Sequence, residues 1–287
     1  MQTIPLKEYD LSAGLYLIAT PIGNNNDISV RSLEYLQSVD LIACEDTRDL
    51  KRLVRHWQLK ECKTIAYHQH NEASSAKGII EQIKQGKSVA LVSDAGTINI
   101  SDPGAILIRQ CLQESIAITS LPGPSSLSTA LSLYPHHCDF CFHGFIDKKS
   151  KSRKEQLEST RNEMAHIFFE SAHRIIQHLE EAASIFPERE ILICKDLSKS
   201  FEQIHFGKLL DLSQNLPLEE GKGEFVLIYS PYSDEKDNAE FLEKSIRIAL
   251  QAGLKNGAIW DWLKAHSNLK RKDFYNHIEK LKQHGKT

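Results

Sequence analysis

Short runs of apolar and often β-branched residues alternate with stretches of helical period over the first four-fifths of the chain. Such runs predict buried strands, and their alternation with amphipathic helices is typical of an α/β fold with mostly parallel strands. A first set of strands is predicted at 15–19, 41–44, 64–67, 89–92 and 116–121. A second set is predicted at 140–145, 167–169, 191–195, 201–206 and 225–229.

Cap and turn residues mark the helices and the boundaries between parts of the chain. We expect Ser29 and Thr47 to cap the helices after the first two strands, and Gly86 to end the third helix. Two prolines in the segment 121–125 predict a turn and a domain hinge. The predicted domains are therefore two α/β domains, at 1–121 and 122–232, and a helical appendage at 233–287.

The appendage has helical period throughout. Ile259, Trp262 and Leu263 share one predicted helix face, and a second helix is predicted through Leu269, Phe274, Ile278 and Leu281. A helix-turn-helix-like module that contacts phosphates and a plain capping pair of helices both explain this pattern.

Composition narrows the class of protein. The chain has 287 residues, of which 41% are hydrophobic and 25% charged, as in ordinary globular proteins. Its apolar runs are far shorter than the roughly 20 residues that span a bilayer, and its first residues lack the features of a secretory signal. Six scattered cysteines suit a reducing compartment, so we expect a cytoplasmic protein with no membrane partner.

The net charge of −3 conceals three basic groups. Residues 147–154 carry five basic side chains and one acidic one, and the chain from Lys255 onward carries eight basic and three acidic residues. The third group contains Arg48, Lys51, Arg52 and Arg55 at helical spacing. Each group is consistent with a solvated face, and together they favour a contact with nucleic acid.

Loops rich in small and polar residues follow several predicted strands, which is where α/β proteins bind ligands. They contain neither a Gly-x-Gly-x-x-Gly pattern nor a Walker A lysine. Cys138 and Cys141 have CxxC spacing, but strand alternation would send them to opposite faces, and no second CxxC is present. His68 and His70 suit a surface loop. We therefore predict no metal site.

Six of these loops, in their order and spacing, resemble the tetrapyrrole methylase-like family, and within it the enzymes that methylate small-subunit ribosomal RNA. The motifs that carry the resemblance are 19–24, 45–48, 93–97, 100–104, 122–125 and 169–174. The resemblance implies two α/β domains with S-adenosylmethionine in the cleft between them, a homodimer, and 2′-O-methylation of a cytidine in the decoding region of 16S rRNA.

The resemblance also implies site residues. Those expected to hold the cofactor are Pro21, Ile22, Gly23, Ser93, Asp94, Ala95, Gly96, Thr97, Ser125 and Ser126. A ribose hydroxyl loses its proton as it attacks the methyl group, so a nearby carboxylate would act as base. Asp46 and Glu170 are the candidates, with Arg48 as a clamp for a phosphate or carboxylate.

The chain departs from the family pattern at a few positions. Ile98 stands where proline is usual, Gln69 where glutamate is usual, and Ala172 where proline is usual. Lys195 replaces an arginine and so loses a bidentate fork. Two alternatives stay open at this point: a relative with the same cofactor and a small-molecule or protein acceptor, and a noncatalytic ribosome-binding protein.

Overall fold

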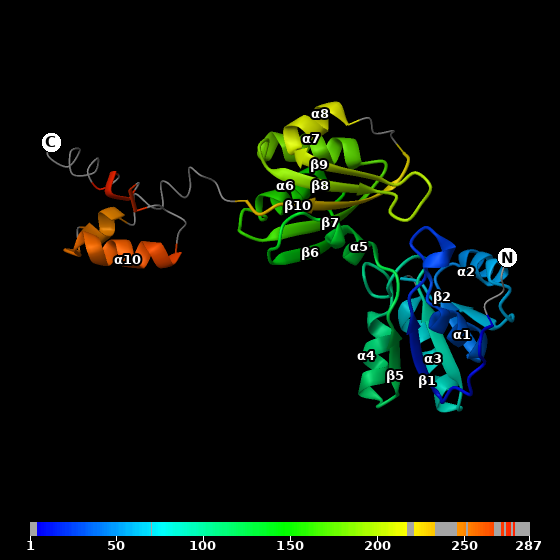
Figure 1. The fold of residues 1–287 in the computed structure, drawn as a ribbon. Coiled ribbons are helices and arrows are strands. Elements are labelled where there is room, and N and C mark those ends of the chain that lie inside the picture. Colours follow the sequence, from blue (N-terminus) through cyan, green and yellow to red (C-terminus); the bar gives the residue numbers. More distant parts are fainter. Residues whose placement is uncertain are drawn as a thin grey trace. The chain divides into compact units, whose positions relative to one another are not determined.

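The computed structural model describes residues 5–69, 71–216, 221–232, 246–250, 252–266, 271–272, 274–276 and 278. It contains two five-stranded sheets, formed by strands from residues 14–121 and 140–229 (Figure 1). Residues 1–160 and 164–230 belong to one compact unit, whereas residues 161–163 and 231–287 belong to a second. Among the described residues, no helix is both long and apolar enough to cross a bilayer.

The first sheet is entirely parallel, with the strand order β3-β2-β4-β1-β5. Its strands are β1 (Gly14–Ile18), β2 (Leu41–Cys44), β3 (Lys63–Ala66), β4 (Ser88–Val92) and β5 (Ile118–Leu121). The helices that connect them are α1 (Val30–Ser38), α2 (Thr47–His56), α3 (Glu72–Lys84) and α4 (Ala105–Gln113), with a short helix η1 (Asn25–Asp27) before α1. This is the alternation that the hydrophobic pattern predicts.

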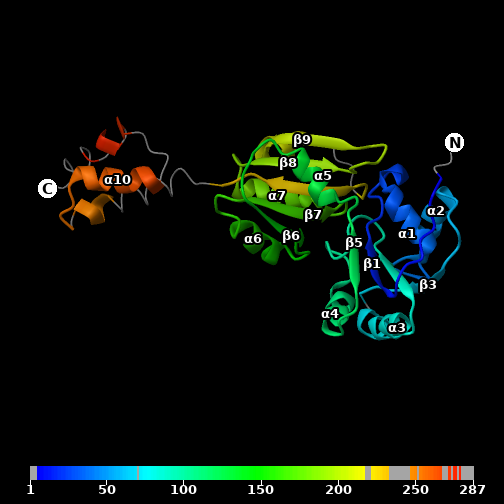
Figure 2. The ribbon, with the colours of Figure 1, turned by 60° about the horizontal axis from the view of Figure 1, so that its bottom comes forward.

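Two helices cover each face of the first sheet (Figures 1 and 2). Leu33 of α1 and Leu50 of α2 are buried against one face, and Ile79 of α3 and Leu107 of α4 against the other. Both faces of the central strands are therefore buried, which explains their continuous apolar sequences. The carboxyl ends of all five strands meet at one edge, and their loops are placed together there.

The second sheet has the order β6-β7-β10-β8-β9 and is mixed. Its strands are β6 (Phe140–Phe145), β7 (Ala165–Ser171), β8 (Glu190–Lys195), β9 (Gln203–Lys208) and β10 (Glu224–Tyr229). Only β6 and β7 run parallel, so the prediction of mostly parallel strands is wrong for this sheet. The short connection from β8 to β9 explains the difference, because a parallel pair needs a long crossover.

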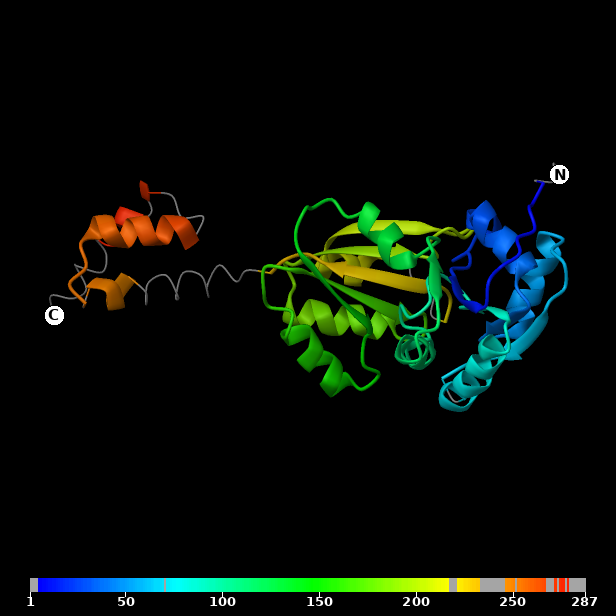
Figure 3. The same ribbon diagram turned by 90° about the horizontal axis from the view of Figure 1, so that it is seen from below.

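Helices lie on both sides of the second sheet (Figure 3). They are α5 (Ser126–Ser132), α6 (Ser150–Glu158), α7 (Ile175–Ile185) and α8 (Leu209–Asn215). Ala130 of α5 packs on the face that carries Ile167 and Val226. On the opposite face, His178 of α7 contacts Tyr229 of β10.

The helix caps agree with the sequence at Ser29 and differ at Thr47. The Ser29 hydroxyl accepts a hydrogen bond from the backbone N–H of Ser32, as a cap does. Thr47 is the first residue of α2, and Asp46 is the cap, accepting from the N–H of Arg48. The prediction for Thr47 was wrong because aspartate, one position earlier, is at least as good a cap.

The second unit has a small core of its own, around Ile259 and Leu263 of α10 (Asn256–His266) and Phe274. Ile246 and Ile278 complete this core. The predicted partner Trp262 is 49% exposed and instead lies outside the core, whereas Trp260 packs against it. Leu269 and Leu281, which were also predicted to face inward, lie outside the described residues.

Candidate active site

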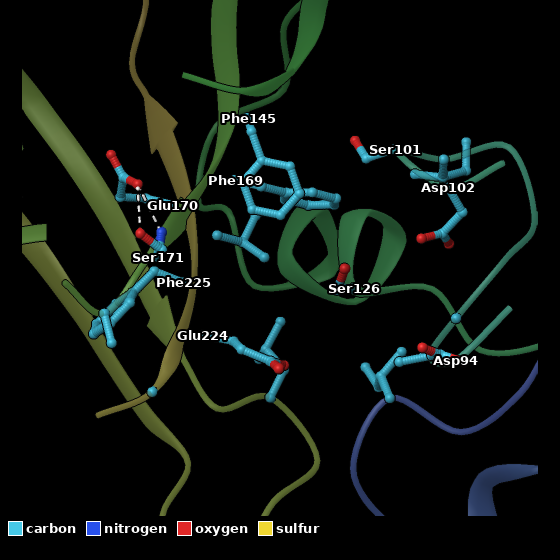
Figure 4. A pocket seen from close by; sticks show the side chains of 18 of the residues that line it. Asp94, Ser101, Asp102, Ser126, Phe145, Phe169, Glu170, Ser171, Glu224 and Phe225 are labelled. Carbon is cyan, nitrogen blue, oxygen red and sulfur yellow. Dashed lines mark hydrogen bonds between the residues drawn. The ribbon is translucent and has the colours of Figure 1, made fainter. Parts of the chain in front are cut away.

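A cavity of about 590 Å³ lies where the loops of the first sheet face the end of β7 and the start of β10 (Figure 4). The loops after β2, β4 and β5 contribute polar and small residues, and the second sheet contributes three phenylalanines and a second set of loops. Residues that line the cavity include Ile22, Glu45, Asp94, Ala95, Gly96, Thr97, Ser101, Asp102, Ser125, Ser126, Phe145, Phe169, Glu170 and Glu224. Its size is that of a site for a small-molecule ligand.

Hydrogen bonds join three loops into one wall of this cavity. Thr20 and Gly96 exchange backbone hydrogen bonds of 3.0 and 2.9 Å, which join the loop after β1 to the loop after β4. The Ser93 hydroxyl donates to the carbonyl of Gly96 at 2.7 Å, and the Thr97 hydroxyl donates to the carbonyl of Pro124 at 2.9 Å. The wall is therefore built before any ligand binds.

Gly96 is required by the shape of this wall. Its φ is +85°, a conformation that side-chain-bearing residues rarely adopt. A Cβ atom there would lie 3.4 Å from Ile22 and 3.8 Å from the carbonyl oxygen of Pro124. Glycine lets the three loops approach closely, and backbone rather than side chain forms this part of the cavity.

Three carboxylates line the cavity from two loops of the first sheet: Glu45 follows β2, and Asp94 and Asp102 follow β4, whereas Glu170 and Glu224 line it from the second sheet. Burial raises the pKa of Glu45, Asp94 and Asp102, and mutual repulsion raises it further. The pKa of Asp102 rises to about 7, because of burial first and then the charges of Glu45 and Asp94. A cavity with this charge favours a positively charged ligand.

Asp46 lies in an adjoining cavity of about 340 Å³. Its carboxylate binds the guanidinium of Arg48 through both oxygens, and these hydrogen bonds lower the pKa of Asp46 to about 2. The Arg48 side chain is 82% exposed and lines neither cavity. The backbone N–H of Asp46 donates to Asp94 at 2.8 Å, so the loop after β2 is tied to the loop after β4.

The Glu170 carboxylate is completely buried at the end of β7. It accepts hydrogen bonds from the backbone N–H of Ser171 at 2.7 Å, from Arg174 at 2.7 Å and from His178 at 3.0 Å. Burial raises the pKa of Glu170, but the hydrogen bonds and the Arg174 charge outweigh it, and the net direction is downward. In Figure 4 this carboxylate lies across the cavity from Asp94 and Asp102.

The structure gathers most of the predicted cofactor residues at these two adjoining cavities. Those at the larger cavity are Ile22, Asp94, Ala95, Gly96, Thr97, Ser125 and Ser126. Those at the smaller cavity are Pro21, Ile22, Gly23, Ser93, Asp94 and Ala95. Because Ile22, Asp94 and Ala95 line both, the two cavities adjoin along one wall.

Sequence reasoning did not select several residues that face the larger cavity. Asp102 and Glu45 stand in the loop motifs, but nothing in the sequence marked their side chains as converging. Phe145, Phe169 and Glu224 belong to or border predicted strands, where apolar or alternating residues are expected for packing alone. They are recognised as cavity residues only in the folded structure, where the ends of their strands border the cavity.

Known proteins match this chain over most of its length. Residues 14–213 match the family model of Tetrapyrrole (Corrin/Porphyrin) Methylases. A relative from Haemophilus influenzae, "Ribosomal RNA small subunit methyltransferase I", is 41% identical over 87% of this chain and 91% of its own. The Bacillus subtilis protein of the same name is 36% identical, over 79% and 78% of the two chains.

The chain belongs to the tetrapyrrole methylase family and, within it, to the family of ribosomal RNA small subunit methyltransferase I. The methyltransferase CobJ has the same fold, with a TM-score of 0.57 and 17% identity over 77% of this chain and 95% of its own. Uroporphyrin-III C-methyl transferase from Thermus thermophilus was solved in complex with S-adenyl homocysteine. It matches with a TM-score of 0.54 and 14% identity, over 76% of this chain and 97% of its own. The predicted family and fold class are confirmed.

The residues present suit the cofactor that tetrapyrrole methylases use, S-adenosylmethionine. This ligand carries positive charge on its sulfur and its amino group, and the cavity offers Glu45, Asp94 and Asp102. Gly96 leaves room where a side chain would otherwise press on Ile22. The donor set and the space therefore both fit.

Ile98, which replaces a proline usual in the family, has a packing role. It is 7% exposed and belongs to the core between the first sheet and helices α3 and α4. A Cβ atom at Gly104 would lie 2.8 Å from its Cγ2 atom, so the loop packs tightly around it. Burial of the isoleucine side chain gives the loop an anchor in place of the fixed φ of proline.

Proposed function

We propose that this chain is an S-adenosylmethionine-dependent methyltransferase that methylates the 2′-oxygen of a cytidine ribose in the decoding region of 16S rRNA. The observation that carries the proposal is the preformed cavity with three carboxylates, in a chain whose relatives are named ribosomal RNA small subunit methyltransferase I. The cofactor, when bound, supplies a methyl group on a positively charged sulfur. The protein must hold it, orient the ribose and accept a proton.

The cofactor would be held by the wall of three loops. Its residues are Pro21, Ile22, Gly23, Ser93, Asp94, Ala95, Gly96, Thr97, Ser125 and Ser126. Backbone groups of Gly96 and its neighbours form the surface, and Asp94 supplies the charge. Because internal hydrogen bonds fix this wall, little ordering accompanies binding.

Asp102 is the best placed proton acceptor. It faces the cavity, no hydrogen bond or ion pair to its carboxylate is found among the described residues, and its pKa of about 7 suits a base at neutral pH. Asp46 and Glu170, the carboxylates that the resemblance suggests, are engaged in salt bridges. We therefore propose structural roles for both. Asp46 caps α2 and orients Arg48, and Glu170 holds the loop after β7 in place.

RNA would be bound by the exposed members of the basic groups, which do not include Arg153, because it is buried in an ion pair with Glu181. The segment 147–154 follows β6 directly, and β6 ends at Phe145, which lines the cavity and is 56% exposed. An exposed aromatic ring beside the site suits stacking with an unpaired base.

We further propose that the protein is a homodimer in the cytoplasm. We also propose that its domains are residues 1–121, 122–232 and 233–287.

Other acceptors are the main alternative for this fold. One structure with the same fold is described as a putative diphthine synthase, with a TM-score of 0.53 and 19% identity, a likeness that concerns the fold alone. The relatives named as ribosomal RNA methyltransferases are 36–42% identical, so a small-molecule or protein acceptor is not favoured. A noncatalytic binder is disfavoured by the intact cavity.

The test is transfer of labelled methyl from S-adenosylmethionine to small ribosomal subunits that lack the modification. Naked 16S rRNA, large subunits and a tetrapyrrole precursor serve as parallel acceptors. We expect label in the small subunit or its RNA only. Label in the tetrapyrrole, or cofactor binding without transfer to either form of the RNA, would contradict the proposal.

A further inference from the structure

Three metal-ligating side chains converge on the second sheet, outside the cavity. Cys141 and His143 are two positions apart in β6, so their side chains point to the same face of the sheet. His166 of β7 is the register partner of Cys141. The sulfur and one nitrogen from each ring all lie within 4.8 Å of one another.

An irregularity in β6 brings His143 into this group. The register between β6 and β7 shifts between Phe142 and Phe145, and Gly144 has a φ of +71°. The His143 ring stacks on Phe168 at 4.6 Å, and its Nε2 atom lies 2.8 Å from Nδ1 of His166. A regular strand would carry the ring further along β7, so the bulge is what makes the two imidazoles converge.

We propose that Cys141, His143 and His166 form a zinc site with a fourth position open to water. Zn²⁺ binds one sulfur at about 2.3 Å and imidazole nitrogens at about 2.0–2.1 Å in tetrahedral geometry. Such a tetrahedron places its ligand atoms roughly 3.3–3.7 Å apart. The two nitrogens share a hydrogen bond of 2.8 Å, and all three ligand atoms lie within 4.8 Å of one another, so zinc would replace that hydrogen bond and part the two rings by about 0.5 Å.

The surroundings of the ligands suit a metal of moderate affinity. His166 is buried and His143 is held by ring stacking, so both rings are already oriented. The positive charge of Arg189 acts on His166 and opposes a cation, which the single thiolate offsets in part.

Cys138, the other half of the CxxC pattern, does not belong to the site. It packs on the opposite face of the sheet, with Ala130 and Leu192. The alternation argument against a Cys138–Cys141 pair therefore holds, but it does not exclude a site that takes its third ligand from the neighbouring strand. The sequence argument against a metal did not consider His166, because it lies 25 residues from Cys141 in the chain.

A metal here would fasten the edge strand β6 to β7. The same strand leads to Phe145 and to the basic segment 147–154. We expect zinc to stabilise this part of the protein. The inference does not depend on the acceptor or on methyl transfer.

The test uses the full-length protein, reduced and stripped of metal, titrated with Zn²⁺ against a chromophoric chelator and separately with Co²⁺. We expect one equivalent of zinc bound with moderate affinity, a thiolate-to-cobalt charge-transfer band and a higher Tm with zinc. Cys141→Ser should abolish the band and weaken zinc binding at least tenfold. Cys138→Ser, which removes the neighbouring thiol on the other face, should change none of these.

His143→Gln provides a second variant at an exposed position and should weaken zinc binding without unfolding the protein. Zinc binding that is equal in wild type, Cys141→Ser and His143→Gln would overturn the proposal. So would an equal loss in Cys138→Ser, or a cobalt spectrum without a thiolate band in the wild-type protein.

Discussion

At the scale of single residues, three acidic side chains near the site differ in what surrounds each carboxylate. Asp46 is paired with Arg48 on the surface, and Glu170 is buried with Arg174 and His178. The charges that act on Asp102 among the described residues are those of two further carboxylates, Glu45 and Asp94. Salt bridges stabilise a carboxylate and weaken it as a base, whereas burial without a partner strengthens it.

Asp102→Asn tests this assignment through both activity and stability. Turnover should fall at least about 100-fold, because loss of a general base typically costs 10²–10⁴. The folded pKa, about 7, is above the ordinary value of 3.8, so the carboxyl favours the folded state below pH 4 and this advantage is lost as the pH rises through 7. Relative to Asp102→Asn, wild type should lose on the order of 2 kcal/mol between pH 5 and 8, allowing for partial exposure. Urea unfolding at both pH values measures this, and parallel changes in the two proteins would contradict it.

Glu170→Gln should act mainly on stability. The change leaves the half-buried Arg174 and the buried His178 without their anionic partner, which typically costs about 3–5 kcal/mol. Asp46→Asn is the control, since asparagine also caps helices and the salt bridge with Arg48 is exposed. Thermal unfolding should separate the two variants clearly. A stable Glu170→Gln protein that binds the cofactor and does not turn over would instead restore Glu170 as the base.

At the scale of elements, the hydrophobic pattern predicted all ten strands; the starts of β5, β7 and β9 differ from the prediction by two residues, as do the ends of β7 and β9. Buried strands in both sheets are short apolar runs, and this local property is visible in sequence. The sequence did not show the direction of β8, β9 and β10, because strand direction depends on the lengths of the connections and on which strands pair. The convergence of Asp102 with Glu45, and of His166 with Cys141, depends on the same pairing.

The loop wall makes a prediction about its glycine. Gly96→Ala should lower stability by about 1 kcal/mol or more, since alanine is strained at a φ of +85°. It should also weaken S-adenosylmethionine binding, because relief of the strained φ would shift the loop that lines the cavity. Gly78→Ala in α3 is the matched control: nothing lies within 4 Å of its Cβ position, and it should stabilise the protein by roughly 0.5–1 kcal/mol. Calorimetric titration with the cofactor would test this, and equal affinity in Gly96→Ala would contradict it.

At the scale of the whole molecule, the two compact units suggest a division of labour. The first contains both sheets and both cavities, and the second contains the helical core around Ile259 and Phe274. The chain from Lys255 onward is rich in basic residues, whereas the cavity is acidic. We expect the cavity to bind the cofactor and the second unit to strengthen binding to RNA.

Removal of residues 233–287 should therefore leave cofactor affinity unchanged and weaken binding to small subunits. Fewer phosphate contacts should also reduce the dependence of RNA affinity on salt. Filter binding at several salt concentrations, alongside cofactor titration, measures both effects. Unchanged RNA affinity and salt dependence in the shortened protein would reduce the helical unit to a role in packing.

The most direct test of the central claim is the chemical position of the transferred methyl group. Small subunits labelled by this protein would be digested, and the labelled nucleotide would be identified together with the sensitivity of its 3′ phosphodiester bond to alkali. We predict a single cytidine of the decoding region, with a bond that resists alkali because its 2′-oxygen is methylated. Label on a base, on a nucleotide elsewhere in the RNA, or on ribosomal protein would contradict the account.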